Sequence, residues 1–283
     1  MKQKERLDQL IVNRGLMPSR EAARTAIMDG GILVDGNKVT KPGQMLDASC
    51  EIILLDAYRP CPYVSRGVYK LKQAIDRFAI QPADRIAIDA GASTGGFTDC
   101  LLQHGARLVY AVDVGYGQIA WSLRTDERVK VIERANIRYL TKDQLYGDNA
   151  QLADLAVCDL SFISLKKILP NLITLLLPGA DSEIISLIKP QFEVGKEKLG
   201  KGGVVREKKL HAEVVGEIID FCRSIDLEII DLTYSPVKGP AGNIEFLIHL
   251  QLRSGQKDLP VDNSADLDGL IQRVIDEAHI ALN

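Results

Sequence analysis

The sequence predicts an α/β protein in which a small N-terminal α+β module precedes a largely parallel, doubly wound sheet. From residue 67 onward, apolar segments of strand length alternate with amphipathic segments of helix length. At 85–106 an apolar strand runs directly into a glycine-rich turn and an amphipathic helix. The first 55 residues instead show two helical patterns followed by strand patterns. These three observations together predict the fold class.

The composition excludes several other classes of protein. The chain has 283 residues, 46% hydrophobic and 26% charged, which is typical of a soluble globular protein with room for two domains. Its five cysteines form no C-x-x-C pair and no metal-ligand spacing with the four histidines, so we expect neither disulfides nor a metal site. The polar N-terminus and the lack of an apolar run of about 20 residues predict a cytoplasmic protein without a membrane span.

The N-terminal patterns predict a compact module of two helices and short strands. Apolar side chains at 4–13 have helical spacing. Ser19 is placed to cap a second helix at 20–28, which a pair of glycines ends. Strand patterns follow at 32–40, around an Asp-Gly-Asn turn, and at 50–55.

This module resembles the S-four-type RNA-binding fold. The resemblance rests on RLDQLIVNRGLMPSREAARTAIMDGGILVDGNKV and the KPG that follows. It implies that the second helix and the adjoining turn present cations to RNA phosphates, which give affinity and orientation rather than sequence choice. The alternative is a protein-interaction module with incidental arginines. The residues expected to bind RNA are Arg14, Arg20, Arg24, Lys38 and, after the module, Arg66.

Composition also indicates the domain boundaries. The stretch DAYRPCPYVSR contains two prolines and little periodicity, so it reads as a linker. From 254 onward there are two basic and six acidic residues, and a helix at about 266–282 has an apolar stripe that we expect to pack on the sheet domain. The expected parts are an RNA-binding domain at 1–56, a linker at 57–66, a catalytic domain at 67–253 and an acidic helical tail at 254–283.

The glycine-rich turn predicts a ligand site. Gly91, Gly95 and Gly96 allow a tight turn, a close approach of the backbone to a ligand and the start of a helix. Their G-x-x-x-G-G spacing fits neither a dinucleotide fingerprint nor a P-loop, and the glycines could serve the strand-to-helix turn alone. Asp113 ends the next strand, where such folds commonly bind a ribose diol. Together these features favour a nucleoside cofactor.

The order of strands narrows the choice of cofactor. The segment 235–243 is too short for a crossover helix, so the last two strands are expected to be antiparallel. A seven-stranded sheet with its last strand reversed is typical of class I, Rossmann-like methyltransferases, and predicts S-adenosylmethionine. Strands are expected at about 86–90, 108–113, 129–132, 154–158, 183–188, 227–234 and 244–252, with helices that include 67–78, 161–177 and 207–223.

Polar side chains lie where strands begin or end, which is where open α/β sheets bind ligands. Asp159 could simply cap a helix, and Glu245 could simply protect an edge strand. Lys189 ends an apolar strand that should be buried, and a lysine at such a place usually has a carboxylate partner or a catalytic task. Lys70, near the start of the helix at 67–78, is by itself typical of a solvated surface lysine.

These four residues lead to a family. Lys70, Asp159, Lys189 and Glu245 resemble the Lys-Asp-Lys-Glu tetrad of FtsJ-like ribose 2′-O-methyltransferases. With the N-terminal module included, the whole chain resembles the TlyA family of rRNA 2′-O-methyltransferases, long labelled haemolysins. The resemblance implies methylation of a ribose, expected to be that of a cytidine, in ribosomal RNA. The matching motifs are VSRGVYKL, DAGASTGGFTDCLL, VDVGYGQ, CDLSFISL, IKPQFEVGK and GNIEF.

The resemblance also implies roles for the residues. A ribose hydroxyl is a poor nucleophile, so the enzyme must align it with the methyl donor and help to remove its proton. Lys189 could be the base if burial and Lys70 lower its pKa; Asp159 and Glu245 would orient the lysines, and Lys70 would hold the target nucleotide. The expected cofactor contacts are Asp89, Gly91, Ser93, Thr94, Gly95 and Phe97, with Asp113 at the ribose and Asn136 near the adenine.

Several further points remain open. The basic segment 196–209 is expected to be a loop beside the target RNA, although it could be only an exposed flexible loop. The expected partner is ribosomal RNA or a ribosomal subunit, and the chain could be a monomer or a homodimer. The alternatives are a membrane-damaging protein, which the lack of an amphipathic membrane segment argues against, and a noncatalytic RNA-binding assembly factor.

Overall fold

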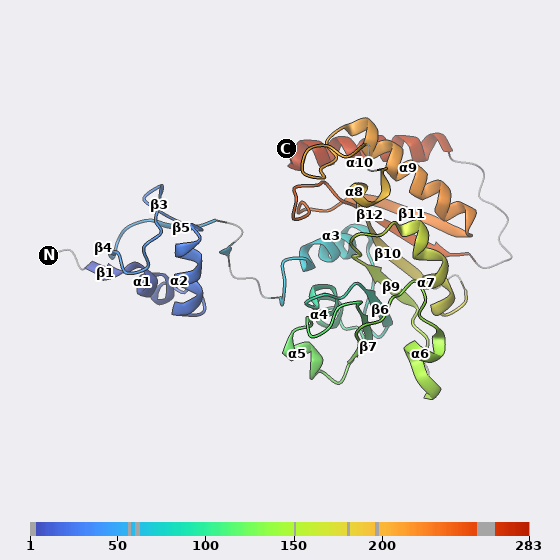
Figure 1. Ribbon diagram of the computed structural model, residues 1–283, viewed down its shortest axis with the longest axis horizontal. Helices are drawn as coiled ribbons and strands as arrows, with labels where there is room; N and C mark the ends of the chain where they lie inside the picture. Colours follow the sequence, from blue (N-terminus) through green and yellow to red (C-terminus); the bar gives the residue numbers. More distant parts are fainter. Residues whose placement is uncertain are drawn as a thin grey trace. The chain divides into compact units, whose positions relative to one another are not determined.

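The structure is a computed structural model that divides into two compact units, Met1–Pro62 and Tyr63–Asn283 (Figure 1). Each unit has its own hydrophobic core. Four of the ten residues of the expected linker, 57 and 60–62 (which include Cys61), residues 196–197 and the first ten residues of the acidic tail lie outside the described residues. The described residues are 4–55, 58–59, 63–149, 151–179, 182–195, 198–253 and 264–282.

The N-terminal unit packs two helices on two small antiparallel sheets, one with the order β3-β2-β5 and one formed by β1 and β4. Ser19 caps α2 as expected, because its Oγ accepts a hydrogen bond from the Ala22 N–H at 3.1 Å. The elements are β1 (Lys4–Arg6), α1 (Leu7–Asn13), α2 (Arg20–Met28), β2 (Ile32–Val34), β3 (Asn37–Lys38), β4 (Met45–Asp47) and β5 (Ile52–Leu54).

One helix of this unit is shorter than predicted. The periodic pattern at 4–13 predicted a single helix, but α1 begins only at Leu7. The three residues before it pair with β4 as an antiparallel strand, in which Glu5 lies opposite Leu46. The apolar side chains that gave the helical spacing, including Leu7 and Ile11, are fully buried in the core of the unit.

The second unit contains a seven-stranded sheet with the order β11-β12-β10-β9-β6-β7-β8. β12 runs antiparallel to both of its neighbours, and the other neighbouring pairs are parallel, which confirms the predicted fold class. The strands are β6 (Ile86–Ala90), β7 (Leu108–Val112), β8 (Val129–Ile132), β9 (Leu155–Cys158), β10 (Glu183–Ile188), β11 (Leu227–Tyr234) and β12 (Phe246–Leu252). The helices are α3 (Val68–Phe78), α4 (Gly96–Gln103), α5 (Trp121–Arg124), α6 (Lys142–Tyr146), α7 (Leu169–Leu175), α8 (Pro190–Glu193), α9 (Lys208–Ser224) and α10 (Ser264–Leu282).

The prediction of a long helix at 161–177 is wrong. The structure has a short 3-10 turn, Leu165–Lys167, and then α7, which ends at Leu175. Pro170 lies in the first turn of α7, the one place where a helix tolerates its missing N–H. Phe162 adopts a φ of 65°, which a right-handed helix cannot contain. The chain between Asp159 and α7 is therefore an ordered loop.

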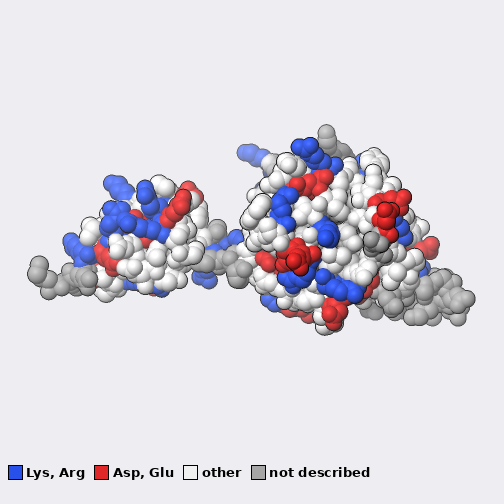
Figure 2. Space-filling model, turned by 90° about the horizontal axis from the view of Figure 1, so that it is seen from below, with Lys and Arg blue, Asp and Glu red and all other residues white. Residues whose placement is uncertain are grey.

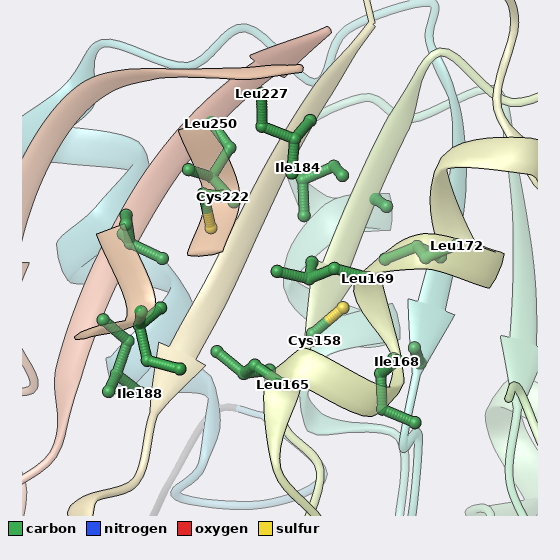
Figure 3. Close-up of a cluster of buried hydrophobic side chains, with 14 of the residues drawn as sticks. Cys158, Leu165, Ile168, Leu169, Leu172, Ile184, Ile188, Cys222, Leu227 and Leu250 are labelled. Carbon is green, nitrogen blue, oxygen red and sulfur yellow. The ribbon is translucent and has the colours of Figure 1, made fainter. Parts of the chain in front are cut away.

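The main core lies between one face of the sheet and the helices α7, α9 and α10. Figure 3 shows Cys158 and Ile184 of the sheet packed against Leu169 and Leu172 of α7 and Cys222 of α9. The apolar stripe of α10 contributes to the same core through Ile271, Val274, Ile275 and Ala278. α3 and α4 pack on each other and on β12 and β7, and they are not part of this cluster among the described residues.

Within the described residues, we find no helix with the length and apolar character needed to cross a bilayer. α10 is the longest helix of the described residues, and acidic residues interrupt its sequence.

Candidate active site

A cavity of about 480 Å³ opens where β6, β7 and β9 end. Four of the residues predicted to bind the cofactor line it, namely Gly91, Ser93, Asp113 and Asn136. Asp159 of the predicted tetrad lines it as well. The glycine-rich turn and Asp159 therefore share one cavity, at the end of the sheet where open α/β proteins bind ligands.

The glycine at position 91 is required by both its backbone and its surroundings. Its φ is 91°, in the left-handed region that favours glycine. A Cβ at this position would lie 2.8 Å from the backbone oxygen of Asp159, which cannot move without moving the loop after β9. Gly91 therefore lets the cofactor turn lie directly against the segment that bears Asp159.

Asp113 is held in place by the backbone of the cavity wall. Its two carboxylate oxygens accept hydrogen bonds from the Ser93 N–H at 2.8 Å and from the Gly115 N–H at 2.6 Å. A carboxylate can accept about four hydrogen bonds, so both oxygens keep capacity for a ligand. This arrangement fits the binding of a ribose diol.

Asp89 lies at the end of β6 and is fully buried. Its Oδ2 accepts a hydrogen bond from the Thr98 hydroxyl at 2.7 Å, whereas its Oδ1 has no hydrogen-bond partner among the described residues. Burial raises the pKa of Asp89 to about 7, although the Thr98 hydrogen bond opposes the rise. A buried carboxylate oxygen without a partner is costly, and a cationic ligand group would relieve that cost.

The remaining predicted cofactor residues lie elsewhere. Among the described residues that line the cavity, Asp89, Thr94, Gly95 and Phe97 are absent. The Thr94 carbonyl accepts a hydrogen bond from the Ala120 N–H at 3.1 Å, and Phe97 is buried in α4. Thr94, Gly95 and Phe97 therefore shape the turn from behind, whereas the unpartnered Oδ1 of Asp89 lies near the end of β6, two residues before Gly91, which lines the cavity.

The four predicted tetrad residues form a continuous chain of alternating charge. Glu245 Oε2 lies 2.7 Å from Lys70 Nζ, which lies 3.5 Å from Asp159 Oδ2. Asp159 Oδ1 in turn lies 2.5 Å from Lys189 Nζ. The exposed fraction is 8% for Lys70, 7% for Lys189 and 1% for Glu245. Residues from α3 and from the ends of β9, β10 and β12 thus meet at one place, with their charges balanced in pairs.

The carboxylates determine the charge of Lys70. Desolvation acts to lower its pKa, but the charges and hydrogen bonds of Asp159 and Glu245 outweigh it and raise the pKa above the usual range. Lys70 is therefore a cation at neutral pH and cannot accept a proton. Because the Asp159 carboxylate contacts both ammonium groups, it also separates Lys70 from Lys189.

Lys189 is linked to the cavity through two residues of its wall. Its Nζ donates a hydrogen bond to Ser161 Oγ at 3.0 Å and pairs with Asp159. Ser161 lines the cavity, as does Gln118, and sequence reasoning identified neither of them. Ser161 lies two residues after Asp159 within CDLSFISL, and this short separation is a sequence signal that Ser161 lies close to the Asp159 carboxylate.

The loop after Asp159 is held by the helix after Lys189. Glu193 of α8 accepts hydrogen bonds from the Ser164 hydroxyl at 2.6 Å and the Leu165 N–H at 2.8 Å. Burial raises the pKa of Glu193 despite these hydrogen bonds. Phe162, at the rim of the cavity, is 90% exposed and lies 5.1 Å, ring centre to ring centre, from Phe192. The loop after Asp159 and α8, which follows Lys189, are therefore held against each other.

The cations predicted to bind RNA fall into two groups within the N-terminal unit. The guanidinium of Arg14 donates hydrogen bonds to the carbonyls of Cys50 and Ala48, and that of Arg20 pairs with the buried Asp8 at 3.1 Å. Arg24 and Lys38 are exposed. Figure 2 shows Lys and Arg side chains of this unit grouped on the visible face, with acidic side chains beside them.

Arg66 belongs to the other unit. It is half-buried just before α3. Asp8, which the sequence did not single out, also binds Arg6, at 2.9 Å. The hydrogen bond from Arg6 and the contact with Arg20 hold the pKa of Asp8 below its usual value, although burial opposes them.

Comparison with known proteins gives matches to two family models. The model of the FtsJ-like methyltransferases matches residues 63–252, and that of the S4 domain matches residues 5–52. The first match covers the unit that bears the cavity and the four paired charges. The second covers most of the N-terminal unit.

Similar proteins extend over nearly the whole chain. The candidate rRNA methyltransferase YqxC of Bacillus subtilis is 46% identical over 99% of this chain and 95% of its own length. The 16S/23S rRNA (cytidine-2′-O)-methyltransferase TlyA of Mycobacterium tuberculosis is 41% identical over 98% of this chain and 99% of its own. A hemolysin-labelled structure from Streptococcus thermophilus has a TM-score of 0.72 at 40% identity and covers 99% of this chain and 98% of that one.

Proposed function

Because this chain belongs to the FtsJ-like methyltransferases and, among them, to the TlyA family, we propose that it methylates ribosomal RNA at a ribose 2′-hydroxyl. The methyl donor is S-adenosylmethionine, and the target ribose is that of a cytidine. The observation that best supports this function is the chain Glu245–Lys70–Asp159–Lys189, because it reaches the cavity of a nucleoside-type site.

The residues of the cavity fit S-adenosylmethionine. Gly91 lines the cavity and lets the turn lie directly against the end of β9, and the Asp113 carboxylate keeps capacity for a ribose diol. The unpartnered oxygen of Asp89 suits a cationic group, which this cofactor has. Asn136 lines the cavity on the side where we place the adenine. When bound, the cofactor supplies an electrophilic methyl group.

The tetrad residues have distinct tasks in this proposal. Lys189 takes the proton of the ribose hydroxyl as the new oxygen–carbon bond forms, and the electron pair of the breaking sulfur–carbon bond stays on sulfur. Asp159 and Ser161 fix the direction of the Lys189 amine. Lys70 remains charged and holds the target nucleotide, and Glu245 balances its charge.

The N-terminal S4 domain is the proposed RNA anchor. Arg24 and Lys38 offer exposed cations for RNA phosphates. Arg14 and Arg20 already bind protein groups, so their contribution to RNA affinity is expected to be smaller. The proposed partner is ribosomal RNA or a ribosomal subunit, and the proposed location is the cytoplasm.

A methyl-transfer assay tests the proposed function directly. The full-length protein is incubated with methyl-labelled S-adenosylmethionine and, separately, with free rRNA and with small and large ribosomal subunits. We expect label at the 2′-oxygen of a cytidine, mapped by the resistance of that linkage to alkaline hydrolysis. A protein that binds the cofactor but labels none of these RNAs would refute the proposal.

The affinity for S-adenosylmethionine is expected to rise with pH. Asp89 must be ionised to pair with a cofactor cation, and burial raises its pKa to about 7. Ionisation therefore increases between pH 6 and pH 7.5, and the affinity should increase about eightfold over this range. Isothermal titration calorimetry in buffers of different ionisation enthalpy would measure both the affinity and the proton released on binding.

Two variants isolate the contribution of Asp89. Asp89→Asn should bind the cofactor more weakly and without this pH dependence. Thr98→Val removes the hydrogen bond that opposes the rise in the Asp89 pKa, so the midpoint of the pH dependence should move upward. An unchanged pH profile in Asp89→Asn would show that another group is responsible.

A further inference from the structure

The second unit has another cavity, of about 270 Å³, that is separate from the cofactor site. One wall is the segment before α9, and the other is the loop between β11 and β12. Neither segment contributes to the cofactor cavity among the described residues. The lining residues are Val204, Val205, Arg206, Lys238, Ala241, Gly242 and Ile244.

A buried side chain joins the two walls of this cavity. Asn243 is 1% exposed; its Oδ1 accepts a hydrogen bond from the Val205 N–H at 2.9 Å, and its Nδ2 donates one to the Gly203 carbonyl at 3.1 Å. The Asn243 carbonyl also accepts a hydrogen bond from the Gly239 N–H at 2.9 Å. The cavity is therefore preformed, which lowers the entropic cost of binding a ligand.

The charge of the lining residues selects for an anion. Arg206 and Lys238 are cationic, both are exposed, and no acidic residue is among the described residues that line the cavity. The other lining residues are small or apolar. A guanidinium and an ammonium on opposite walls are the usual protein partners of a phosphate group.

The cavity is physically connected to the tetrad. The loop that contains Lys238 and Gly242 leads directly into Glu245. A Cβ at Gly239 would lie 2.5 Å from Glu245 Oε1, so the backbone of this loop rests on the tetrad carboxylate. A ligand bound between Arg206 and Lys238 therefore lies on the segment that holds Glu245 in place.

We infer that this cavity binds a backbone phosphate of the substrate RNA, from a nucleotide next to the methylated ribose. The inference rests on the proposed function. A ribose presented to the tetrad carries phosphates on both sides, and a preformed cationic cavity on the Glu245 segment can take one of them. Such a contact fixes the register of the strand without reading its sequence.

The surrounding basic segment supports the choice of Arg206. Lys208 is paired with Asp276 at 2.6 Å, and Lys198 lies 3.6 Å from Glu213. The basic excess of this segment is thus partly neutralised by ion pairs at the protein surface, whereas Arg206 lines the cavity. Among the described cations of the segment 196–209, Arg206 is the one that lines the cavity.

The test compares Arg206→Ala, Lys238→Ala and the double variant with the wild-type full chain. Lys130→Ala is the matched control, because Lys130 is an exposed lysine of β8 at the opposite edge of the sheet. We expect the double variant to raise the KM for RNA about tenfold with little change in kcat or in cofactor affinity. The salt dependence of RNA affinity should become shallower by about one phosphate contact. If an alanine variant does not fold, Arg206→Gln replaces it, because glutamine removes the charge and keeps most of the length of the side chain.

Several results would overturn the inference. One is unchanged RNA affinity and salt dependence in the folded double variant, and another is an equal loss in Lys130→Ala. A third is binding of inorganic phosphate that disappears in the variants while RNA affinity does not change, which would make the cavity a site for a free anion. If the wild type transfers no methyl group, the proposed function fails, but the RNA-affinity measurements still decide this inference.

Discussion

Replacement of Lys189 by alanine is expected to lower kcat for methyl transfer by about 10²- to 10⁴-fold, the range typical of a lost general base. Binding of S-adenosylmethionine should be unchanged, because the amine reaches the cavity only through Asp159 and Ser161. The fold should also persist, since Asp159 keeps its contact with Lys70. The KM for RNA should change little.

The control for this variant is Lys72→Ala. Lys72 lies in α3, two residues from Lys70, and its 43% exposed side chain pairs only with Asp76 of the same helix among the contacts described. It should retain full activity. Single-turnover rates measured across pH separate loss of a proton acceptor from loss of binding. Wild-type rates in folded Lys189→Ala would disprove the assigned role of the tetrad lysine.

Replacement of Glu245 by leucine is expected to destabilise the protein by about 3–5 kcal/mol, because it leaves the buried ammonium of Lys70 with only its longer contact to Asp159. Combining it with Lys70→Met should recover most of that loss, since replacing both partners of a buried pair with apolar side chains is often neutral. Methyl transfer should be absent in both proteins. The double variant would therefore regain stability without regaining activity.

Urea denaturation followed by circular dichroism measures this difference, with the two units analysed as separate transitions. The raised pKa of Lys70 fixes the expected pH range. The contribution of the pair is complete below the unfolded-state pKa of about 10.5 and is lost as the pH rises through the higher folded-state value. A double variant no more stable than Glu245→Leu would contradict the pairing.

Much of the fold of the second unit follows from the sequence. The alternation of apolar and amphipathic segments located all seven strands, and the short segment 235–243 predicted that the last one is reversed. The helix predicted at 161–177 was wrong because apolar spacing alone did not reveal the loop before Pro170. The strand Lys4–Arg6 was missed because its partner, β4, has no apolar alternation of its own.

The sequence predicted which residues form the candidate site, but it did not predict which of their charged side chains form pairs. A lysine at the end of a buried strand pointed to Lys189, and the resemblance to TlyA proteins, which the comparisons confirm, supplied Lys70. The order of the charges depends on how α3 packs beside the sheet, which no local pattern encodes. That order is what raises the pKa of Lys70 and leaves Lys189 as the candidate base.

The packing of α10 has a consequence for solubility. β11 is an outer strand of the sheet, and outer strands invite pairing with other chains. α10 packs against β11 and α9, and Lys208 and Asp276 form an ion pair between the two helices. The helix thus covers apolar surface of β11 and α9 that would otherwise be exposed to solvent. Its outer face carries acidic side chains. Removal of α10 is therefore expected to expose this apolar surface beside an outer strand and to promote association between chains.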